Sequence, residues 1–376
     1  MNQFLGNPSE QYESLYVHVP FCAGKCEYCA FYSKGESTGE ERRAFRHRLD
    51  AELREAQPRL QNLHTLFIGG GTPSVLAEPE LTDLLGSLHR HAAWRPGAEL
   101  TMECNPESLD ADKIAAMAKF GINRASVGIQ SFSDRLRQVL GRGGNLDRLP
   151  DWLACLKDHG IDNLGADLIY GIPGQTLADW EQDLELAFDL GIRHLSTYEL
   201  TWDEGSKLAR RGHLEPVCPD LAVFMWRLTA EVGGPRGFVR YEVSNLARPG
   251  FECRHNQGVW HGAPYLGCGP AACSFDGRER WSNPADLQKW LRRKPAEPDE
   301  LSAEARAAEI LAFGMRTLEG WNCDQFKQRT GFDLWHLRGS QLAALAEQGL
   351  IAIGDETVRP TEEGFLFADY IAEQLL

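Results

Sequence analysis

The chain lacks the features of membrane, secreted and nucleic-acid-binding proteins. No apolar run in its 376 residues approaches the roughly 18 residues of a membrane-spanning helix. The opening Met-Asn-Gln-Phe-Leu-Gly-Asn-Pro has neither the basic nor the apolar segment of a signal peptide. Positive charge is scarce, because 39 Lys and Arg residues stand against 54 Asp and Glu residues, a formal net charge of −15. We therefore predict a cytoplasmic protein with no transmembrane segment and no nucleic acid partner.

Disulfide bonds are not expected either. Ten cysteines in a chain of this length, without a signal peptide, are typical of metal ligands and buried thiols. Hydrophobic residues make up 43% and charged residues 25%, which is ordinary for a globular protein. Because the chain is too long for one average domain, we expect one large domain and a smaller one.

Three cysteines, Cys22, Cys26 and Cys29, lie close together after a short run of β type. A structural zinc site would need a fourth ligand nearby, but Ala-Phe-Tyr-Ser comes next. Three thiolates can instead hold three irons of a cubane cluster, which leaves the fourth iron free to bind a small molecule. The spacing therefore predicts a [4Fe-4S] cluster of the catalytic type.

Segments of strand and helix type alternate over the first 200 residues. After the run that precedes Cys22, strands are expected at 65–68, 99–104, 124–130, 163–170 and 194–200, with amphipathic helices between them. This alternation indicates parallel β/α units with right-handed connections. Six units are fewer than the eight of a closed TIM barrel, so we predict a partial, TIM-like (β/α)6 barrel.

The rest of the chain changes character twice. A helix is expected over 201–240, and residues 241–283, rich in aromatics and glycine with little helical period, read as a long functional connection. Helices followed by a hairpin at 350–360 and a last helix at 361–375 predict a small winged-helix-like α+β domain. Its charge is not basic, which favours a packing or partner surface over DNA binding. We divide the chain into a barrel (1–240), a family-specific connection (241–298) and a C-terminal domain (299–376).

Polar side chains and glycines follow the predicted strands, at the edge where such barrels bind ligands. The run from Gly69 to Pro73 ends the second strand, and glycine there lets a ligand approach the backbone closely. Glu103, Gln130 and Asp167 stand near the ends of the next three strands. One such residue is often only a loop anchor, but three on consecutive strands favour a binding site.

Cys22-x3-Cys26-x2-Cys29 resembles the cluster motif of the radical S-adenosylmethionine (SAM) superfamily, in which the open iron binds SAM. The glycine run is similar to the superfamily motif that receives the SAM amino group. Resemblance to the coproporphyrinogen oxidase branch implies SAM contacts at Tyr16, Tyr28, Gly70, Gly71, Thr72, Glu103, Gln130, Arg142 and Asp167. Arg142 is expected to pair with a SAM carboxylate, and Thr201 is a weaker candidate.

Several segments together resemble the HemW family of haem chaperones, which are related to oxygen-independent coproporphyrinogen III oxidase. They are Tyr16-x-His-x-Pro-Phe-Cys22, Phe67-Ile-Gly-Gly-Gly-Thr-Pro-Ser74, Glu103-x-Asn-Pro106, Gly128-Ile-Gln-Ser-Phe132 and Asp167-Leu-Ile-Tyr-Gly-Ile-Pro-Gly-Gln175. The oxidase has a longer N-terminal arm and a fourth cysteine where this chain has Phe31. The resemblance therefore implies a protein that binds a [4Fe-4S] cluster, SAM and haem or porphyrin, and transfers haem to an acceptor protein.

Two alternatives stay open. One is an oxygen-independent coproporphyrinogen III oxidase, which would use a 5'-deoxyadenosyl radical to decarboxylate propionate side chains oxidatively; Phe31 and the short N-terminus argue against it. The other is an interaction protein that kept the fold and lost the cluster, against which the three intact cysteines argue. Whether SAM is cleaved, and hence whether the protein is an enzyme, is left open by the sequence.

His255 is the residue for which the resemblance implies haem binding. The segment Arg254-His-Asn-Gln-Gly-Val-Trp260 is similar to the family motif His-Asn-x-x-Tyr-Trp, and neutral imidazole is a good axial ligand for haem iron. A loop-packing histidine is the alternative. The chain departs from the family at Val259, where the family has tyrosine, and at Cys273, where it has histidine. A thiolate can also ligate haem, so the second departure either alters the ligand set or removes a contact.

Overall fold

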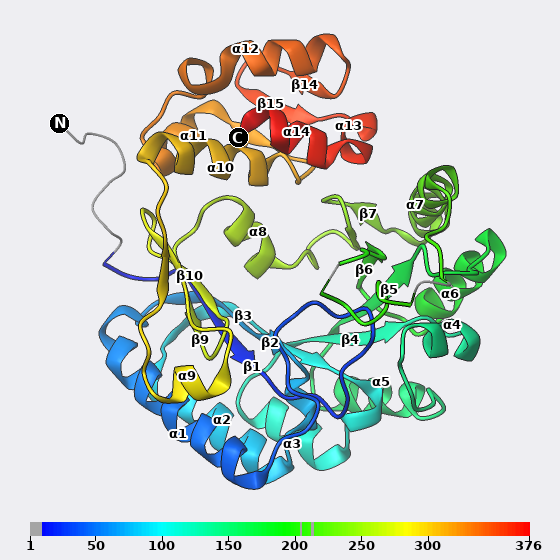
Figure 1. Ribbon diagram of the computed structural model, residues 1–376, viewed down its shortest axis with the longest axis vertical. Helices are drawn as coiled ribbons and strands as arrows, with labels where there is room; N and C mark the ends of the chain where they lie inside the picture. The colour runs from blue at the N-terminus through cyan, green and yellow to red at the C-terminus, as the bar shows by residue number, and fades with distance from the viewer. Residues whose placement is uncertain (1–9, 204, 212–213) are drawn as a thin grey trace.

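The computed structural model describes residues 10–203, 205–211 and 214–376 (Figure 1). Residues 1–9, where we expected no targeting segment, lie outside this range. Six parallel strands neighbour one another in chain order: β1 (Ser14–Val19), β2 (Leu63–Gly70), β3 (Trp94–Cys104), β4 (Arg124–Gln130), β5 (Asn163–Tyr170) and β6 (His194–Glu199). The connecting helices are α1 (Gly39–Ala56), α2 (Glu78–His91), α3 (Ala111–Lys119), α4 (Asp134–Val139), α5 (Leu149–Asp158) and α6 (Leu177–Asp189). They follow the outside of the curved sheet, which confirms the predicted partial (β/α)6 barrel (Figure 1).

The first β/α unit shows how local sequence builds this barrel. Val17 and Val19 of β1 are fully buried, as β-branched side chains facing covering helices should be. Thr38 begins α1 with a capping box, in which its hydroxyl accepts the N–H of Glu41 and the Glu41 carboxylate accepts the N–H of Thr38. Leu49 and its helical neighbours then bury one face of α1 against the sheet.

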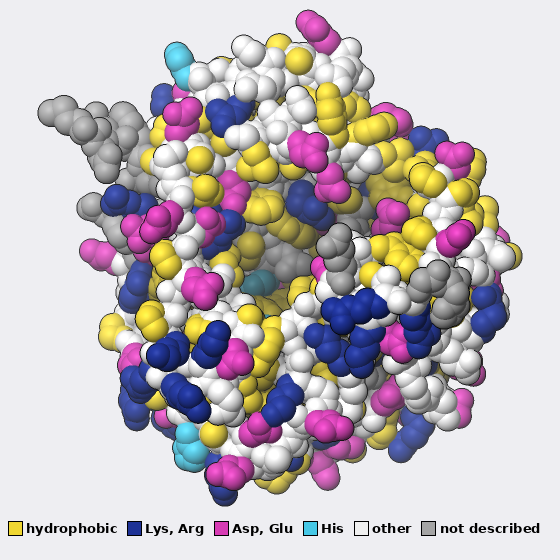
Figure 2. All heavy atoms as spheres, viewed as in Figure 1, with side chains coloured by type: hydrophobic (Ala, Val, Ile, Leu, Met, Phe, Trp, Pro, Cys, Tyr) yellow, Lys and Arg dark blue, Asp and Glu magenta, His cyan; other side chains and the backbone are white. Residues whose placement is uncertain are grey.

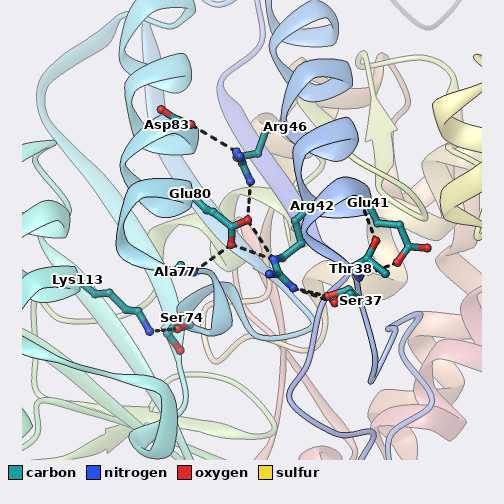
Figure 3. Close-up of polar contacts among 10 residues, drawn as sticks. All are labelled: Ser37, Thr38, Glu41, Arg42, Arg46, Ser74, Ala77, Glu80, Asp83 and Lys113. Atoms are coloured by element: carbon teal, nitrogen blue, oxygen red, sulfur yellow. Dashed lines mark hydrogen bonds and ion pairs between the residues drawn. The ribbon is translucent and has the colours of Figure 1, made fainter.

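A shared carboxylate joins the first two helices (Figure 3). Arg42 and Arg46 of α1 both donate to Glu80 of α2, at 2.9 and 3.0 Å. Further along the chain, Lys113 of α3 donates to the carbonyl of Ser74 at 3.0 Å, in the turn that follows β2. The glycine-rich turn after β2 is therefore held from the helix side as well as from the sheet.

The segment that we expected to be a connection adds strands to both edges of the same sheet. β9 (Tyr265–Cys268) lies parallel to β1, and β10 (Cys273–Phe275), β11 (Arg280–Ser282) and β12 (Glu297–Asp299) continue from it in antiparallel order. β8 (Asn245–Ala247) extends the edge at β6, and β7 (Val239–Arg240), which precedes this segment, pairs with β8. Helix α8 (Arg254–Trp260) lies between the barrel and the C-terminal helices, and α9 (Leu287–Leu291) lies beside α1 (Figure 1). Such short helices show too few turns for a helical period to appear in the sequence.

The helix expected over 201–240 is much shorter than predicted. Helix α7 covers only Pro219–Gly233. Proline favours the first helical position, and the sequence Gly-Gly-Pro at 233–235 ends the helix, where a short 3-10 turn follows. The described residues before Pro219 form a loop that follows β6 and returns to the cysteine loop, where the N–H of Leu208 donates to the carbonyl of Glu27 at 2.9 Å.

The C-terminal domain has a hydrophobic core of its own. It consists of α10 (Ala303–Gly314), β13 (Trp321–Asn322), α11 (Cys323–Thr330), α12 (Leu334–Glu347), the hairpin β14 (Ile351–Ile353) and β15 (Thr357–Pro360), α13 (Glu362–Leu366) and α14 (Ala368–Leu375). Leu311, Phe326, Leu342 and Val358 are fully buried within it. This is the predicted winged-helix-like α+β arrangement, except that the expected last helix is broken in two at Phe367, whose φ of −112° and ψ of 28° are not helical. No helix in the described part of the chain is long and apolar enough to span a bilayer.

Candidate functional site

The three clustered cysteines lie on the loop between β1 and α1 and are partly exposed. Burial, and then the neighbouring Cys26 and Cys22, raise the pKa of Cys29, so the three sulfurs are close enough to affect one another. Over the residues that the structure describes, no three His, Cys, Asp or Glu side chains converge as they would on one metal ion. The thiolates of a cubane bind different irons and need no such convergence, so the loop fits a [4Fe-4S] cluster.

The turn after β2 lies directly against this loop. The hydroxyl of Thr72 donates to Sγ of Cys22 at 3.7 Å. Gly70 has a φ of +102°, and a Cβ there would lie 2.5 Å from Nδ1 of His18. A Cβ on Gly71 would lie 2.6 Å from a backbone carbonyl oxygen of the cysteine loop. Glycine is therefore required at both positions for the turn to pack under the cysteines.

Two predicted SAM contacts, Glu103 and Asp167, are carboxyl groups that influence each other. Glu103 accepts the N–H of Gly70 at 3.2 Å, and Asp167 accepts the hydroxyl of Ser126 at 3.0 Å. Burial, and then the Asp167 carboxylate, raise the pKa of Glu103 to about 8, and burial raises the pKa of Asp167. Carboxyl groups whose pKa values are raised in this way mark a place where a cationic ligand group would be stabilised.

Gln130, Arg142 and Tyr28 form a second group at the end of β4. Gln130 adopts a φ of 72° at a register shift between β4 and β5. A Cβ on Gly128 would lie 2.9 Å from Nε2 of Gln130 and 3.4 Å from Nη2 of Arg142, so both side chains pack directly against this glycine. Burial raises the pKa of Tyr28, while the adjacent Arg142 guanidinium opposes the rise. The group therefore ties the cysteine loop, which carries Tyr28, to the strand ends.

A cavity of about 780 Å³ opens among β1, β2, β3 and α8, within the range of small-molecule sites. It brings together residues from both predicted sets: Tyr16 and Glu103 from the SAM contacts, and His255, Val259 and Cys273 from the haem region. The other predicted residues do not line it: Cys22, Cys26, Cys29, Tyr28, Gly70, Gly71, Thr72, Gln130, Arg142, Asp167 and the exposed Thr201. Figure 2 shows a hollow in the middle of one face, between the barrel and the C-terminal helices.

His255 is a buried side chain, 5% exposed, on the wall of this cavity. Its Nδ1 lies 2.8 Å from the hydroxyl of Thr65, which donates onward to Ser14 at 2.9 Å. The ring lies against Phe67 and Tyr16, with centroid distances of 5.2 and 6.4 Å. Burial lowers the pKa of His255 to about 3, so its imidazole is neutral near pH 7. Among the described residues, Nε2 has no hydrogen-bond partner.

A buried carboxylate holds the helix that carries His255. Glu99 of β3 accepts the N–H groups of Arg254 and His255, each at 3.1 Å, at the start of α8. Its side chain is 3% exposed, and a carboxylate at a helix N-terminus satisfies N–H groups that have no partner within the helix. The position of His255 in the cavity is therefore fixed from the barrel interior.

Sequence reasoning assigned no role to several residues of this site. His18 bonds the hydroxyl of Tyr16 at 3.1 Å and the carbonyl of Tyr32 at 2.9 Å, and Tyr198 lines the cavity beside Glu103. Tyr16 and His18 are two residues apart on one strand, so their side chains lie on the same face of the sheet. This spacing could have indicated from the sequence that His18 accompanies Tyr16 in the site. Tyr198 and Tyr32 carry no such signal, because only the folded chain brings them to the cavity.

Comparison with known proteins agrees with this geometry. Residues 16–187 match the family model of the radical SAM superfamily, and residues 301–367 match that of the HemN C-terminal domain. The chain is 30% identical to the protein named heme chaperone HemW of Lactococcus lactis, over 96% of this chain and 97% of that protein. It is 31% identical to heme chaperone HemW of Escherichia coli, over 96% and 98%.

The solved structure of coproporphyrinogen III oxidase (HemN) from Escherichia coli, a radical SAM enzyme, shares the fold. Its TM-score is 0.83 at 20% identity, over 98% of this chain and 91% of that one. Together with identities above 30% to relatives matched over nearly their whole length, these matches show that the chain belongs to the HemW family of the radical SAM superfamily.

Proposed function

We propose that this protein is a haem chaperone that binds a [4Fe-4S] cluster, SAM and haem, and transfers the haem to an acceptor protein. Relatives that carry the name heme chaperone support the haem role, and the superfamily supports the cluster and SAM. Cys22, Cys26 and Cys29 would hold the cluster, which supplies one iron that is open to SAM. Glu103 would accept from a cationic group of SAM, and Arg142 would donate to its carboxylate.

His255 carries the haem part of the proposal. Its imidazole is neutral and buried, and one nitrogen is held by Thr65. The other nitrogen, on the cavity wall, has no hydrogen-bond partner in the part of the chain that the structure describes. This is the arrangement of a histidine that ligates a metal, whose second nitrogen is oriented by a hydrogen bond. Phe67, Trp260 and Val259 give the same cavity the apolar surface that a porphyrin ring needs.

An optical titration tests this proposal. The protein is reconstituted with iron and sulfide without oxygen, then titrated with SAM and afterwards with haem, as wild type and as His255→Ala. We expect a shifted Soret band in the wild type, and haem binding at least about tenfold weaker in the variant. His261→Ala is the matched control, because both nitrogens of His261 already bond backbone carbonyls, at 2.9 and 3.1 Å. A wild type that leaves the haem spectrum unchanged would overturn the haem assignment.

The main competing function is that of a coproporphyrinogen oxidase. Phe31, 72% exposed, occupies the position at which we expect a fourth cysteine in that enzyme. The reconstituted protein, supplied with SAM, a reductant and coproporphyrinogen III in the absence of oxygen, should form no protoporphyrinogen. Product formation in that assay would favour the oxidase over the chaperone.

A further inference from the structure

Cys273 is the cysteine that shares the cavity with His255. All ten cysteines of the chain lie in its described part, and Cys273 alone among them lines the cavity. It opens β10 and is partly exposed. Three of the others are on the cysteine loop, and the remainder are buried or lie elsewhere: Cys104, Cys155, Cys218, Cys253, Cys268 and Cys323.

The polar neighbours of Cys273 link it to the side chains that hold His255. The hydroxyl of Tyr265 donates to Sγ of Cys273 at 3.5 Å. Tyr265 begins β9 and pairs in register with Ser14 of β1. Ser14 is the end of the hydrogen-bond chain that starts at His255 and passes through Thr65. The side chains that bond the thiol and the imidazole therefore lie on the neighbouring strands β9, β1 and β2, while the thiol itself is on β10 and the imidazole on α8.

The second observation is the free nitrogen of His255. His255 is only 5% exposed, and within the described residues its Nε2 has no hydrogen-bond partner. Nε2 is not one of the fully buried polar atoms that lack a partner, so it is accessible from the cavity, where a ligand atom can take its lone pair. Imidazole nitrogen and thiolate sulfur are both established donors to haem iron.

We propose that Sγ of Cys273 is a second iron ligand, together with Nε2 of His255, for haem held in this cavity. The proposal rests on the proposed function and adds a ligand to it. On binding ferric haem, the S–H bond breaks, an iron–sulfur bond forms and the proton passes to solvent, with no change in oxidation state. The Tyr265 hydroxyl then donates to the bound sulfur, the kind of contact that orients a ligand and tunes its metal.

Absorption and electron paramagnetic resonance spectra of the haem-loaded full chain test this ligand. The wild type is compared with Cys273→Ser, Cys273→His and the control Cys218→Ser, whose thiol is exposed and outside the cavity. We expect the wild type and the control to show a thiolate-to-iron charge-transfer band in absorption and the low-spin ferric signal of thiolate-ligated haem in electron paramagnetic resonance. Cys273→Ser should lose both while still binding haem through His255, and Cys273→His should give the spectrum of two imidazole ligands.

The outcomes separate the two proposals. Haem binding by wild type and Cys273→Ser with superimposable spectra would overturn the Cys273 ligand and leave the chaperone proposal standing. No haem binding by the wild type would overturn both. Circular dichroism and iron content equal to wild type show that a variant is folded and loaded. If Cys273→Ser does not fold, Cys273→His decides: loss of the thiolate signals with haem still bound supports the proposal, and a spectrum identical to wild type in that variant opposes it.

Discussion

Nδ1 of His255 and the hydroxyl oxygen of Thr65 are 2.8 Å apart, at the start of a hydrogen-bond chain that continues to Ser14. Because the Thr65 proton is directed to Ser14, the proton shared with the imidazole belongs to Nδ1. The lone pair of the neutral ring is then on Nε2, the nitrogen on the cavity side. Thr65 thus selects the tautomer that a metal ligand requires.

Replacing Thr65 by valine should weaken haem binding. The variant keeps the size of the side chain but cannot accept the Nδ1 proton, so the tautomer and ring orientation are no longer fixed. Loss of such an orienting partner typically costs about 10- to 100-fold in metal affinity. Optical titration measures the effect, with Thr330→Val as a control for a buried threonine of the C-terminal domain. Equal affinities of the two variants would contradict the assigned role.

Removing the Glu99 carboxylate should destabilise the barrel. Glu99→Ala leaves two N–H groups of α8 without their acceptor and removes an anion near the fully buried Arg124, whose pKa is raised by its anionic surroundings against the effect of burial. Breaking a buried charge arrangement costs about 3 to 5 kcal/mol, against about 1 kcal/mol for an ordinary helix cap. Urea denaturation compares it with Asp110→Ala, the cap of α3. A cost no larger than that of Asp110→Ala would show that Glu99 is only a cap.

The pH dependence of stability should report on Glu103. Its pKa is about 8 in the folded protein and near 4.5 in the unfolded chain, so between these values the folded state holds an extra proton. The resulting stability is complete below about pH 4.5 and is lost as pH rises through about 8. Glu103→Gln cannot ionise, so its free energy of unfolding relative to the wild type should rise by a few kcal/mol between about pH 6 and pH 9. The measurement uses protein without cluster or SAM, and a pH-independent difference would contradict it.

Glycine at position 70 should be essential for the site. In Gly70→Ala the new Cβ meets the His18 ring in a backbone conformation of φ +102°, which strains the turn beside the cysteine loop. We expect loss of iron loading and a lower melting temperature. Gly143→Ala is the control, because a Cβ there has no atom within 4 Å. Normal iron content in Gly70→Ala would show that the turn adapts.

The three loop cysteines should be needed for iron and the other cysteines should not. Serine at position 22, 26 or 29 removes one thiolate from the cluster, and iron content after anaerobic reconstitution should fall sharply in each case. Cys104→Ser serves as a control, because Cys104 is buried at the end of β3 and is not part of the loop. Full iron content in a loop variant would assign the cluster to other ligands.

The repeating pattern of the barrel could be predicted from the sequence. Alternation of apolar strands and amphipathic helices depends on local periodicity, and five of the six predicted strands lie within the strands β2 to β6 or extend one residue past them. The predicted length of the helix over 201–240 was wrong, because Pro219 and the glycines at 233 and 234 limit the helix to fifteen residues. Strands β9 to β12 gave no clear pattern, since strands of three or four residues contain too few side chains to show a period.

Residue types and their spacing were enough to predict the chemistry: three thiols at cluster spacing, glycines after the second strand, carboxyl groups at strand ends and a histidine in a family motif. Those features are local, because they depend on residue type and on spacing along one segment. The folded chain was needed to show that Tyr16, Glu103, His255 and Cys273 share one cavity, and that Thr65 and Glu99 hold His255. Thr65 and Glu99 are 190 and 156 positions from His255, so these contacts exist only once α8 has packed against the sheet.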